Sequence, residues 1–229
     1  MNISVIIPAY NEEENLKILL PQLHGIISSL GCAYELIVAD SQKTADNSEA
    51  VCKSNGAKYV IQSGSGYADA FRTGIKMSVY EAVLVVDADN SQDISRIPQM
   101  YDSLLSGADV AIGSRYVKGG TTDDPLVSVI MSKLLNFTYR VVLGFKQKDV
   151  STDFRFYRKE KLKKIQTSCE NFDVIEETLF LLKKKYPDLK ITEVPIDYKQ
   201  RAEGVSKRRL LHFIAGYIKL TFKLFRLRF

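Results

Sequence analysis

Two carboxylates one residue apart, Asp87 and Asp89, stand at the end of the apolar run "AVLVV". Where a strand gives way to a loop the chain can turn, so that both carboxylates approach one hard cation, with waters and a ligand's phosphates completing the shell. Mg²⁺ or Mn²⁺ bridging a diphosphate suits this arrangement and stabilises the charge that develops on a departing nucleoside diphosphate. A solvated acidic turn is the alternative, because Asp is also common at helix N-caps.

A second polar group follows the first apolar run of the chain. In "VIIPAYNEEENL" a buried strand is broken by Pro8, and Asn11 and several acids precede the next helical pattern. This order places polar groups over the same sheet edge as Asp87 and Asp89. An ordinary strand-to-helix junction with capping residues is the alternative interpretation.

Strands and helices alternate through the first half of the chain and must position these groups. The patterns predict strands at 3–8, 35–39, 58–62 and 83–86, a fifth strand in "ADVAIGSRY", and helices at 12–30, 48–54, 68–78 and 94–105. Continuously apolar strands alternating with helices predict an α/β fold with a mostly parallel sheet covered on both faces. Ligands of such sheets bind at the carboxyl ends of the strands, where Asp40 also falls.

Beyond Tyr116 the pattern changes. "KGGTTDDP" is predicted to be a loop, followed by a helix at 126–143 and a later helix carrying Ile175, Leu179, Leu182 and Tyr186. "KITEVPIDYKQR" is predicted to be an edge strand, since Pro195 has no N–H to donate. We expect one compact domain over 1–204, with a nucleotide-binding half at 1–116 and an acceptor half at 117–204.

Composition excludes several classes of protein. With two histidines, His24 and His212, a Ser-His-Asp or Cys-His centre is not expected, and three widely spaced cysteines argue for a reducing compartment and against structural zinc. The N-terminus resembles a strand rather than a secretion signal. No apolar run approaches the roughly 20 residues of a transmembrane helix.

The last segment, 205–229, is predicted to be a basic amphipathic helix. It contains no acid and seven basic residues: Lys207, Arg208, Arg209, Lys219, Lys223, Arg226 and Arg228. On a helical wheel most of its cations lie opposite a wide apolar face, which is typical of a helix lying in a membrane interface. A terminal helix packed on the domain or in a dimer is the alternative. Nucleic acid is not an expected partner, because no aromatic stacking platform accompanies these cations.

Six stretches in order resemble the motifs of family 2 glycosyltransferases, in particular the dolichol-phosphate mannosyltransferases. They are "VIIPAYNEEENL", "GSGYADAFRTGIKMS", "VVDADNSQDISRIPQM", "ADVAIGSRYVKGG", "DVSTDFRFYRKE" and "ITEVPIDYKQRAEGVSK". The resemblance implies a glycosyltransferase A fold, a single Rossmann-like nucleotide-sugar-binding domain. It also implies inverting, metal-dependent transfer of a hexose, mannose or glucose, from a GDP- or UDP-hexose to a polyprenyl phosphate.

The resemblance also implies roles for individual residues. Those against the nucleotide sugar are Pro8, Tyr10, Asn11, Glu12, Asp40 and Asp87. Those that serve the metal ion, Mg²⁺ or Mn²⁺, are Asp87, Asp89 and Ser91. Those that bind the acceptor phosphate are Arg115, Lys133, Arg201, Ser206 and Lys207, and the catalytic residues are Asp89, Arg115 and Arg201.

One stretch departs from the family pattern. Relatives have "DDGS" and a further acid after the second strand, whereas this chain reads "IVADSQKTADNS", with Ala39 in place of the first acid. The family's acids at this place help to read the nucleoside. The resemblance therefore leaves GDP and UDP both open.

The acceptor decides whether a catalytic base is needed. A lipid monophosphate has a second pKa of about 6 and arrives as an anion, so it can attack without a base. A saccharide hydroxyl needs a base, for which Glu176 or Glu177 stands in the right region; alternatively both acids stabilise the first turn of a helix. A third hypothesis is a non-catalytic, membrane-bound partner of a synthase. We expect a peripheral protein on the cytoplasmic face of a membrane, in contact with lipid and with a possible membrane-protein partner.

Overall fold

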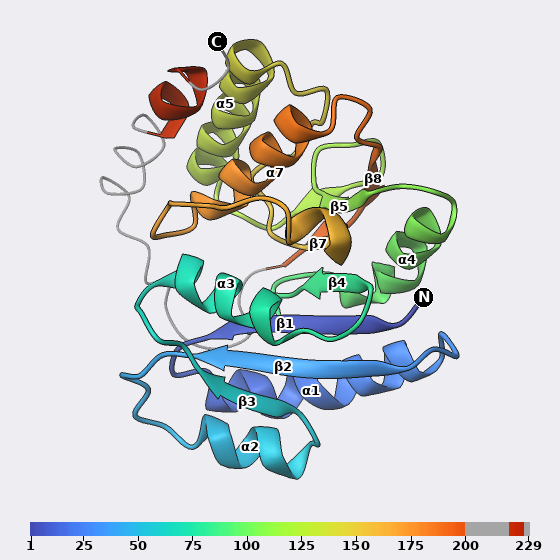
Figure 1. The fold of residues 1–229 in the computed structure, drawn as a ribbon, viewed down its shortest axis with the longest axis vertical. Coiled ribbons are helices and arrows are strands. Elements are labelled where there is room, and N and C mark those ends of the chain that lie inside the picture. The colour runs from blue at the N-terminus through green and yellow to red at the C-terminus, as the bar shows by residue number, and fades with distance from the viewer. Residues whose placement is uncertain (200–219, 227–229) are drawn as a thin grey trace.

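The computed structural model of this chain describes residues 1–199 and 220–226. Its described part is built on a seven-stranded sheet in the order β3-β2-β1-β4-β7-β5-β8 (Figure 1). All neighbours are parallel except the two pairs that β7 makes, with β4 and β5. The strands are β1 (Ile3–Ala9), β2 (Tyr34–Asp40), β3 (Lys58–Ile61), β4 (Ala82–Val85), β5 (Val110–Ser114), β7 (Arg155–Arg158) and β8 (Ile191–Pro195).

Helices cover both faces of this sheet. They are α1 (Glu13–Ser28), α2 (Ser48–Ser54), α3 (Tyr67–Met77), α4 (Ile97–Leu105), α5 (Leu126–Leu143), α6 (Lys159–Leu162) and α7 (Val174–Lys185), with a 3₁₀ turn η1 (Ile94–Arg96). Successive side chains of a strand face opposite sides, so Val5 belongs to the apolar cluster that includes residues of α1, α2 and α4, whereas Ile6 belongs to the cluster that includes residues of α3, α5 and α7. Burying one such side chain contributes about 1.5–3 kcal/mol. The predicted α/β fold is confirmed.

The order of strands reverses beside β1. The chain adds β2 and β3 on one side of β1 and then returns to place β4 on the other side. The connections that follow β1 and β4 therefore run in opposite directions and leave a crevice between the carboxyl ends of these two strands. Open α/β sheets bind their ligands in such a crevice. Pro8 and the Asp87–Asp89 stretch lie at these two ends.

The second half of the chain contains a small sheet that the sequence did not predict. The stretch expected to be a loop contains β6 (Thr121–Thr122), which pairs with β9 (Asp197–Tyr198) in a separate two-stranded sheet. Gly120 permits this course, because a Cβ there would lie 2.5 Å from the Ser114 carbonyl oxygen. The predicted edge strand is confirmed, since β8 ends the order of the sheet.

The predicted C-terminal helix is described only over 220–226, which is helical, while 205–219 and 227–229 lie outside the described residues. Leu220 and Leu224 are buried in the same apolar cluster as α7. Phe222 and Phe225 remain 66% and 43% exposed. This part of the segment therefore packs on the domain through one side and keeps aromatic side chains on the other.

The sequence was expected to contain no segment long and apolar enough to span a membrane. Among the described residues, α5 is long and apolar enough to do so by length and composition alone, and 17% of this helix is buried inside the protein. Its inner side is nevertheless held on the domain, because Asn136 and Tyr139 are buried. The Asn136 side chain also accepts a hydrogen bond from Val150 N at 2.6 Å.

Candidate functional site

The carboxylates of Asp87 and Asp89 follow β4 in a turn that the sequence can adopt locally. Asn90 has a φ of 59°, a left-handed conformation that Asn tolerates better than most residues. Asp89 is buried, and its Oδ1 accepts hydrogen bonds from Ser91 Oγ at 2.6 Å and Ser91 N at 3.1 Å. The turn thus fixes the Asp89 carboxylate relative to the end of the strand.

Both carboxylates line one cavity of about 380 Å³ at the carboxyl ends of β1 and β4. Its described lining consists of Pro8, Ala9, Tyr10, Glu12, Ser41, Lys43, Gln62, Ser65, Gly66, Tyr67, Ala70, Asp87, Ala88, Asp89 and Phe172. We call this space the donor cavity. The structure therefore brings together five of the site residues expected from the sequence: Pro8, Tyr10, Glu12, Asp87 and Asp89.

Asn11 and Asp40 are not part of that lining and instead hold the loop behind it. Asn11 Oδ1 accepts a hydrogen bond from Ala45 N at 2.9 Å. The buried Asp40 carboxylate accepts from Ser41 N at 2.7 Å, Thr44 Oγ1 at 2.5 Å and Tyr59 Oη at 3.0 Å. The loop fixed in this way contributes Ser41 and Lys43 to the donor cavity.

Two aromatic residues of the lining were not expected from the sequence. The rings of Tyr67 and Phe172 stack with centroids 4.3 Å apart. Tyr67 Oη donates to Asp153 Oδ2 at 2.6 Å, and Gln92 Nε2 donates to Asp153 Oδ1 at 2.7 Å. Gln92 Oε1 in turn accepts from Asp87 N at 3.1 Å. Asp153 thereby links the aromatic wall to the backbone of the acidic turn.

Tyr67 keeps its proton in this network. Burial, and then the charge of Asp153, raise the pKa of Tyr67. Its position in "GSGYADAF" gave a usable signal, because that stretch resembles a family motif. Phe172, in "ENFDV", gave none, because an aromatic before a helix is indistinguishable in sequence from a core residue.

The donor set of the acidic turn fits a hard divalent cation. Carboxylate oxygens suit Mg²⁺ and Mn²⁺, and both Asp87 and Asp89 face the donor cavity. Among residues 1–199 and 220–226 no group of three or more His, Cys, Asp or Glu is placed to hold a metal. A cation there would take further ligands from water and a diphosphate. Ser91 Oγ, also expected as a ligand, donates to Asp89.

Arg115, one of the residues expected to bind the acceptor phosphate, belongs to a buried ionic cluster. Its Nε and Nη2 donate to the two oxygens of Asp149 at 2.8 and 2.9 Å, and its Nη1 lies 3.6 Å from Asp124 Oδ2. Burial alone would lower the pKa of Arg115. The charge of Asp149 and its hydrogen bond outweigh this effect, so the pKa of Arg115 is raised above its usual value. Burial raises the pKa of Asp149, but Arg115 lowers it below its usual value.

Lys133 lies beside this cluster. The guanidinium carbon of Arg115 lies 5.0 Å from the centroid of the Tyr116 ring, and Lys133 Nζ lies 5.6 Å from the same centroid. The structure therefore brings these two cations to one aromatic side chain. The Tyr198 ring lies 5.4 Å from the same guanidinium carbon. The remaining expected phosphate ligands, Arg201, Ser206 and Lys207, lie outside the described residues.

Glu177, one of the two candidate bases, already forms hydrogen bonds and an ion pair with other groups of the protein. The buried carboxylate accepts from Ser168 N and Cys169 N at 2.8 and 2.9 Å and from Lys223 Nζ at 2.6 Å. Burial raises its pKa, but the Lys223 hydrogen bond and the backbone donors lower it below the usual value. Glu176 is also buried. Neither acid belongs to the described lining of the donor cavity.

The sequence matches the family model described as glycosyl transferase family 2 over residues 4–166. The chain belongs to glycosyl transferase family 2. Two curated relatives are each 32% identical to it. Dolichol-phosphate mannosyltransferase of Pyrococcus furiosus aligns with 90% of this chain and 59% of its own length. Polyprenol monophosphomannose synthase of Mycolicibacterium smegmatis aligns with 89% of this chain and 79% of its own.

Solved structures agree with this family assignment at the level of the fold. Glucosyl-3-phosphoglycerate synthase from Mycobacterium tuberculosis, in complex with Mg²⁺ and UDP, superimposes with a TM-score of 0.74 at 19% identity, covering 99% of this chain and 79% of that one. A complex of the same enzyme with Mn²⁺, UDP and phosphoglyceric acid also gives a TM-score of 0.74, at 20% identity over 99% and 78%. The glycosyltransferase A fold expected from the sequence is confirmed.

Proposed function

We propose that this protein transfers a hexose, mannose or glucose, from a GDP- or UDP-hexose to a polyprenyl phosphate at a membrane surface. The observation that carries the donor half of this proposal is the donor cavity, which Asp87 and Asp89 share with the end of β1. The acceptor half is supported by the two curated relatives, whose names join mannose with dolichol phosphate or polyprenol. The chain spans 59% of the first of these relatives.

On the donor side, Asp87 and Asp89 would hold Mg²⁺ or Mn²⁺. When bound, the ion would neutralise the charge that develops on the departing nucleoside diphosphate. Pro8, in β1, and Tyr10, just after it, line the donor cavity, and Tyr67 and Phe172 form an aromatic wall. These side chains are suited to orient the flat base or the sugar, and they displace water from the apolar part of the cavity.

On the acceptor side, cations take the place of a base. The lipid phosphate has a second pKa of about 6 and attacks as an anion. Arg115 and Lys133 would reduce its repulsion from the donor diphosphate, with Lys133 as a point charge rather than a planar fork. A general base works best with a pKa near the operating pH, whereas the pKa of Glu177 is lowered by Lys223 and backbone donors. This occupation of Glu177 favours a phosphate over a saccharide hydroxyl as acceptor.

The membrane surface is supported by the outer side of α5. Six large apolar side chains there are exposed: Leu126, Val127, Ile130, Leu134, Phe137 and Val141. At 100° per residue they share one side of the helix. We propose that this α5 face lies in the membrane interface, with Phe222 and Phe225 as further contacts and Lys133 and Arg140 near lipid phosphates. A helix held by Asn136 and Tyr139 on its other side is suited to lie on a bilayer.

The test is a donor screen with a polyprenyl phosphate in detergent or vesicles. Radiolabelled GDP-mannose, GDP-glucose, UDP-mannose and UDP-glucose are offered in turn with Mn²⁺, and label is counted in the organic phase. We expect one donor to label the lipid, and chelation of Mn²⁺ to stop the reaction. Label that moves only to a soluble saccharide would establish the hydroxyl acceptor instead. No binding of any donor with Mn²⁺ would favour a non-catalytic partner of a synthase.

A further inference from the structure

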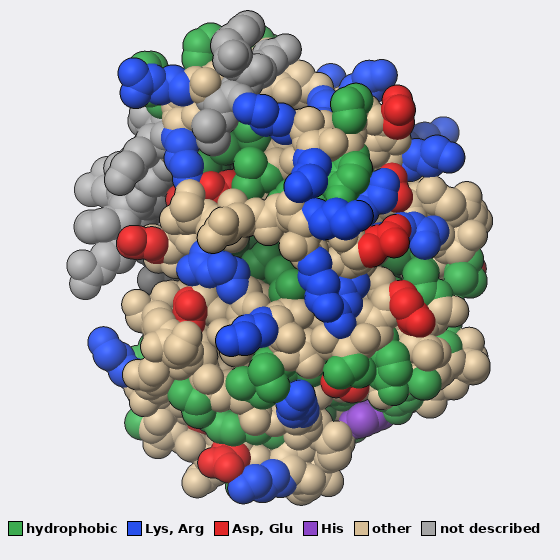
Figure 2. All heavy atoms as spheres, viewed as in Figure 1, with side chains coloured by type: hydrophobic (Ala, Val, Ile, Leu, Met, Phe, Trp, Pro, Cys, Tyr) green, Lys and Arg blue, Asp and Glu red, His purple; other side chains and the backbone are tan. Residues whose placement is uncertain are grey.

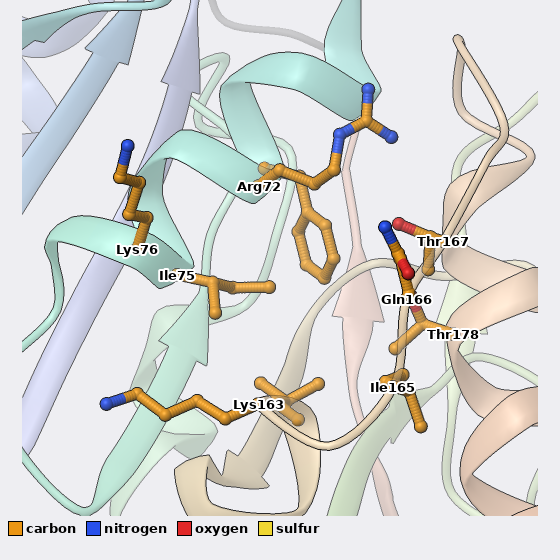
Figure 3. A pocket seen from close by; sticks show the side chains of 10 residues that line it. Arg72, Ile75, Lys76, Lys163, Ile165, Gln166, Thr167 and Thr178 are labelled. Carbon is orange, nitrogen blue, oxygen red and sulfur yellow. The ribbon is translucent and has the colours of Figure 1, made fainter.

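A second cavity of about 410 Å³ lies between α3 and the segment that joins α6 to α7. Figure 3 shows Arg72, Ile75 and Lys76 of α3 on one side and Gln166, Thr167 and Thr178 across from them. Its described lining consists of Phe71, Arg72, Ile75, Lys76, Leu162, Lys163, Ile165, Gln166, Thr167 and Thr178. We call this space the basic cavity, and it shares no described lining residue with the donor cavity.

The rim of the basic cavity carries an excess of positive charge. Figure 2 shows Lys and Arg side chains gathered around an apolar hollow on this face. Arg72, Lys76 and Lys163 contribute three cations, and no acid belongs to the described lining. Arg72 has Asp69 at 4.0 Å, at the limit of an ion pair. A positive charge nearby stabilises the charged form of an anion, so three cations without a lining acid favour an anionic ligand in this cavity.

The floor of the basic cavity is apolar, with one polar exception. Phe71, Ile75, Leu162 and Ile165 supply hydrocarbon surface. Thr178 is fully buried, and its Oγ1 has no hydrogen-bond partner among the described residues. A buried hydroxyl without a partner destabilises the protein, because it has lost its hydrogen bonds to water without replacing them. A ligand oxygen that reached it would remove that cost.

We propose that the basic cavity is a second ligand site, which takes an organic phosphate with an apolar body. Figure 3 shows the charged ends of Arg72, Lys76 and Lys163 pointing in different directions around the cavity. These flexible side chains would turn toward the phosphate, and the apolar body would cover Phe71 and Ile75. Such a phosphate can come from a free metabolite or from a lipid headgroup. The volume of about 410 Å³ suits a small organic molecule.

Occupation of this site would be felt at the donor cavity, because the same two segments wall both spaces. Arg72 Nη1 donates to Cys169 O at 2.8 Å, which ties α3 to the segment that follows α6. Five residues earlier on α3, Tyr67 stacks on Phe172 of that same segment. A phosphate that draws Arg72 away from Cys169 would therefore loosen the contact that positions Phe172.

The first test measures binding in the absence of nucleotide and metal, so that it does not depend on the proposed function. Octyl phosphate below its micelle concentration, inorganic phosphate and vesicles containing phosphatidic acid are titrated in turn. We expect octyl phosphate to bind at least tenfold more tightly than inorganic phosphate, since the floor is apolar. The double variant Lys76→Gln, Lys163→Gln should weaken its binding about tenfold. The matched control Lys53→Gln, Lys58→Gln, which removes two exposed charges elsewhere, should bind like the wild type.

The arms of this titration separate the two sources of phosphate. If the double variant loses octyl phosphate alone, the ligand is a free molecule; if it loses vesicles alone, the ligand is a headgroup. No loss in either arm, or equal binding of inorganic and octyl phosphate, overturns the proposal. So does a loss of octyl phosphate binding in Asp89→Ala, which would place the ligand in the donor cavity.

Thr178→Val supplies a second test, in which stability and binding move in opposite directions. The substitution removes a buried hydroxyl without a partner, so the melting temperature should stay the same or rise. Octyl phosphate should nevertheless bind several-fold more weakly. Hydrogen exchange should change on binding at 165–172 and not in α2. Unchanged affinity in Thr178→Val together with unchanged exchange at 165–172 would contradict the assignment.

Discussion

The donor cavity and the Arg115 cluster each contain a buried aspartate, but the two carboxylates are compensated differently. Asp89 accepts hydrogen bonds from the neutral side chain and backbone of Ser91, whereas Asp149 forms a two-pronged ion pair with Arg115. On the donor side the carboxylates face a space that a cation can enter. In the Arg115 cluster the charge is balanced within the protein. Asp89 is therefore suited to ligand chemistry, and Asp149 to holding a cation in place.

The sharpest way to break this comparison is to neutralise Asp149. Asp149→Asn leaves Arg115 buried with Asp124, at 3.6 Å, as its remaining carboxylate. We expect the free energy of unfolding, measured in urea, to fall by about 3–5 kcal/mol, as for other broken buried pairs. The matched control is Asp124→Asn. Because the Asp124 side chain is 27% exposed, this substitution should lower the free energy of unfolding by less than about 1 kcal/mol. Equal costs would remove the distinction between the two acids.

The same pair predicts a pH dependence. Arg115 holds the pKa of Asp149 below its usual value despite the effect of burial. A lowered native pKa contributes stability that is complete above the unfolded pKa of about 3.9 and is lost as the pH falls through the native value. The wild type should therefore lose stability from about pH 4 downward. In Asp149→Asn, that part of the acid slope should be missing.

Removing the donor-side carboxylate should instead spare the fold and stop the reaction. Asp89→Ala should lower kcat/KM for sugar transfer at least about 100-fold, or about 2.7 kcal/mol, because diphosphate charge is no longer neutralised. It should also weaken Mn²⁺-dependent nucleotide binding. Asp102→Ala, which removes an exposed acid from α4, serves as the control. A fully active Asp89→Ala protein would exclude the metal hypothesis.

The α5 face gives a third contrast, between membrane and solution. Ile130→Ser combined with Phe137→Ser should weaken vesicle binding about tenfold, since both side chains are expected among acyl chains. Turnover of a short-chain soluble acceptor should not change, because both side chains are more than half exposed. Val79→Ser, at an apolar residue exposed elsewhere, is the control. Parallel losses in both assays would assign the α5 face to packing.

The smallest expected effect concerns the link between the aromatic wall and the acidic turn. Tyr67→Phe removes the hydrogen bond to Asp153 and should cost about 1 kcal/mol of stability. It should also weaken Mn²⁺-dependent nucleotide binding by a few-fold. Tyr34→Phe removes a similar hydrogen bond, to His24, away from the cavity. If Tyr34→Phe weakened nucleotide binding as much, the effect would be one of general stability.

The parts of the fold that local patterns control were predictable from the sequence. Apolar strands such as Val83–Val86 and the acids after them follow from periodicity and position, and the structure places β4 at Ala82–Val85 with Asp87 and Asp89 beyond it. The antiparallel insertion of β7 was not predictable. Its Arg155 is fully buried because its guanidinium donates to the carbonyl oxygens of Val150 and Ile175, partners that a local pattern does not reveal.

The candidate site divides in the same way. Residues next to a strand end, such as Pro8 and Asp89, were expected and do line the donor cavity. Phe172 reaches that cavity from a segment more than 100 residues from Tyr67 in sequence, through tertiary packing. Asp40 was expected to contact the ligand, but its buried carboxylate is occupied by Ser41, Thr44 and Tyr59. Its predicted contact with the base or ribose remains a prediction.

The ion pair between Lys223 and Glu177 has a practical consequence for anyone who shortens this chain. Lys223 also donates to Ser168 Oγ at 2.6 Å, so the helical residues 220–226 brace the segment that ends at Phe172. A version trimmed before residue 220 to ease purification would lose this brace. We expect the trimmed protein to bind nucleotide more weakly. That loss could be mistaken for a defect of the active site, although residues 220–226 lie outside the described lining of the donor cavity.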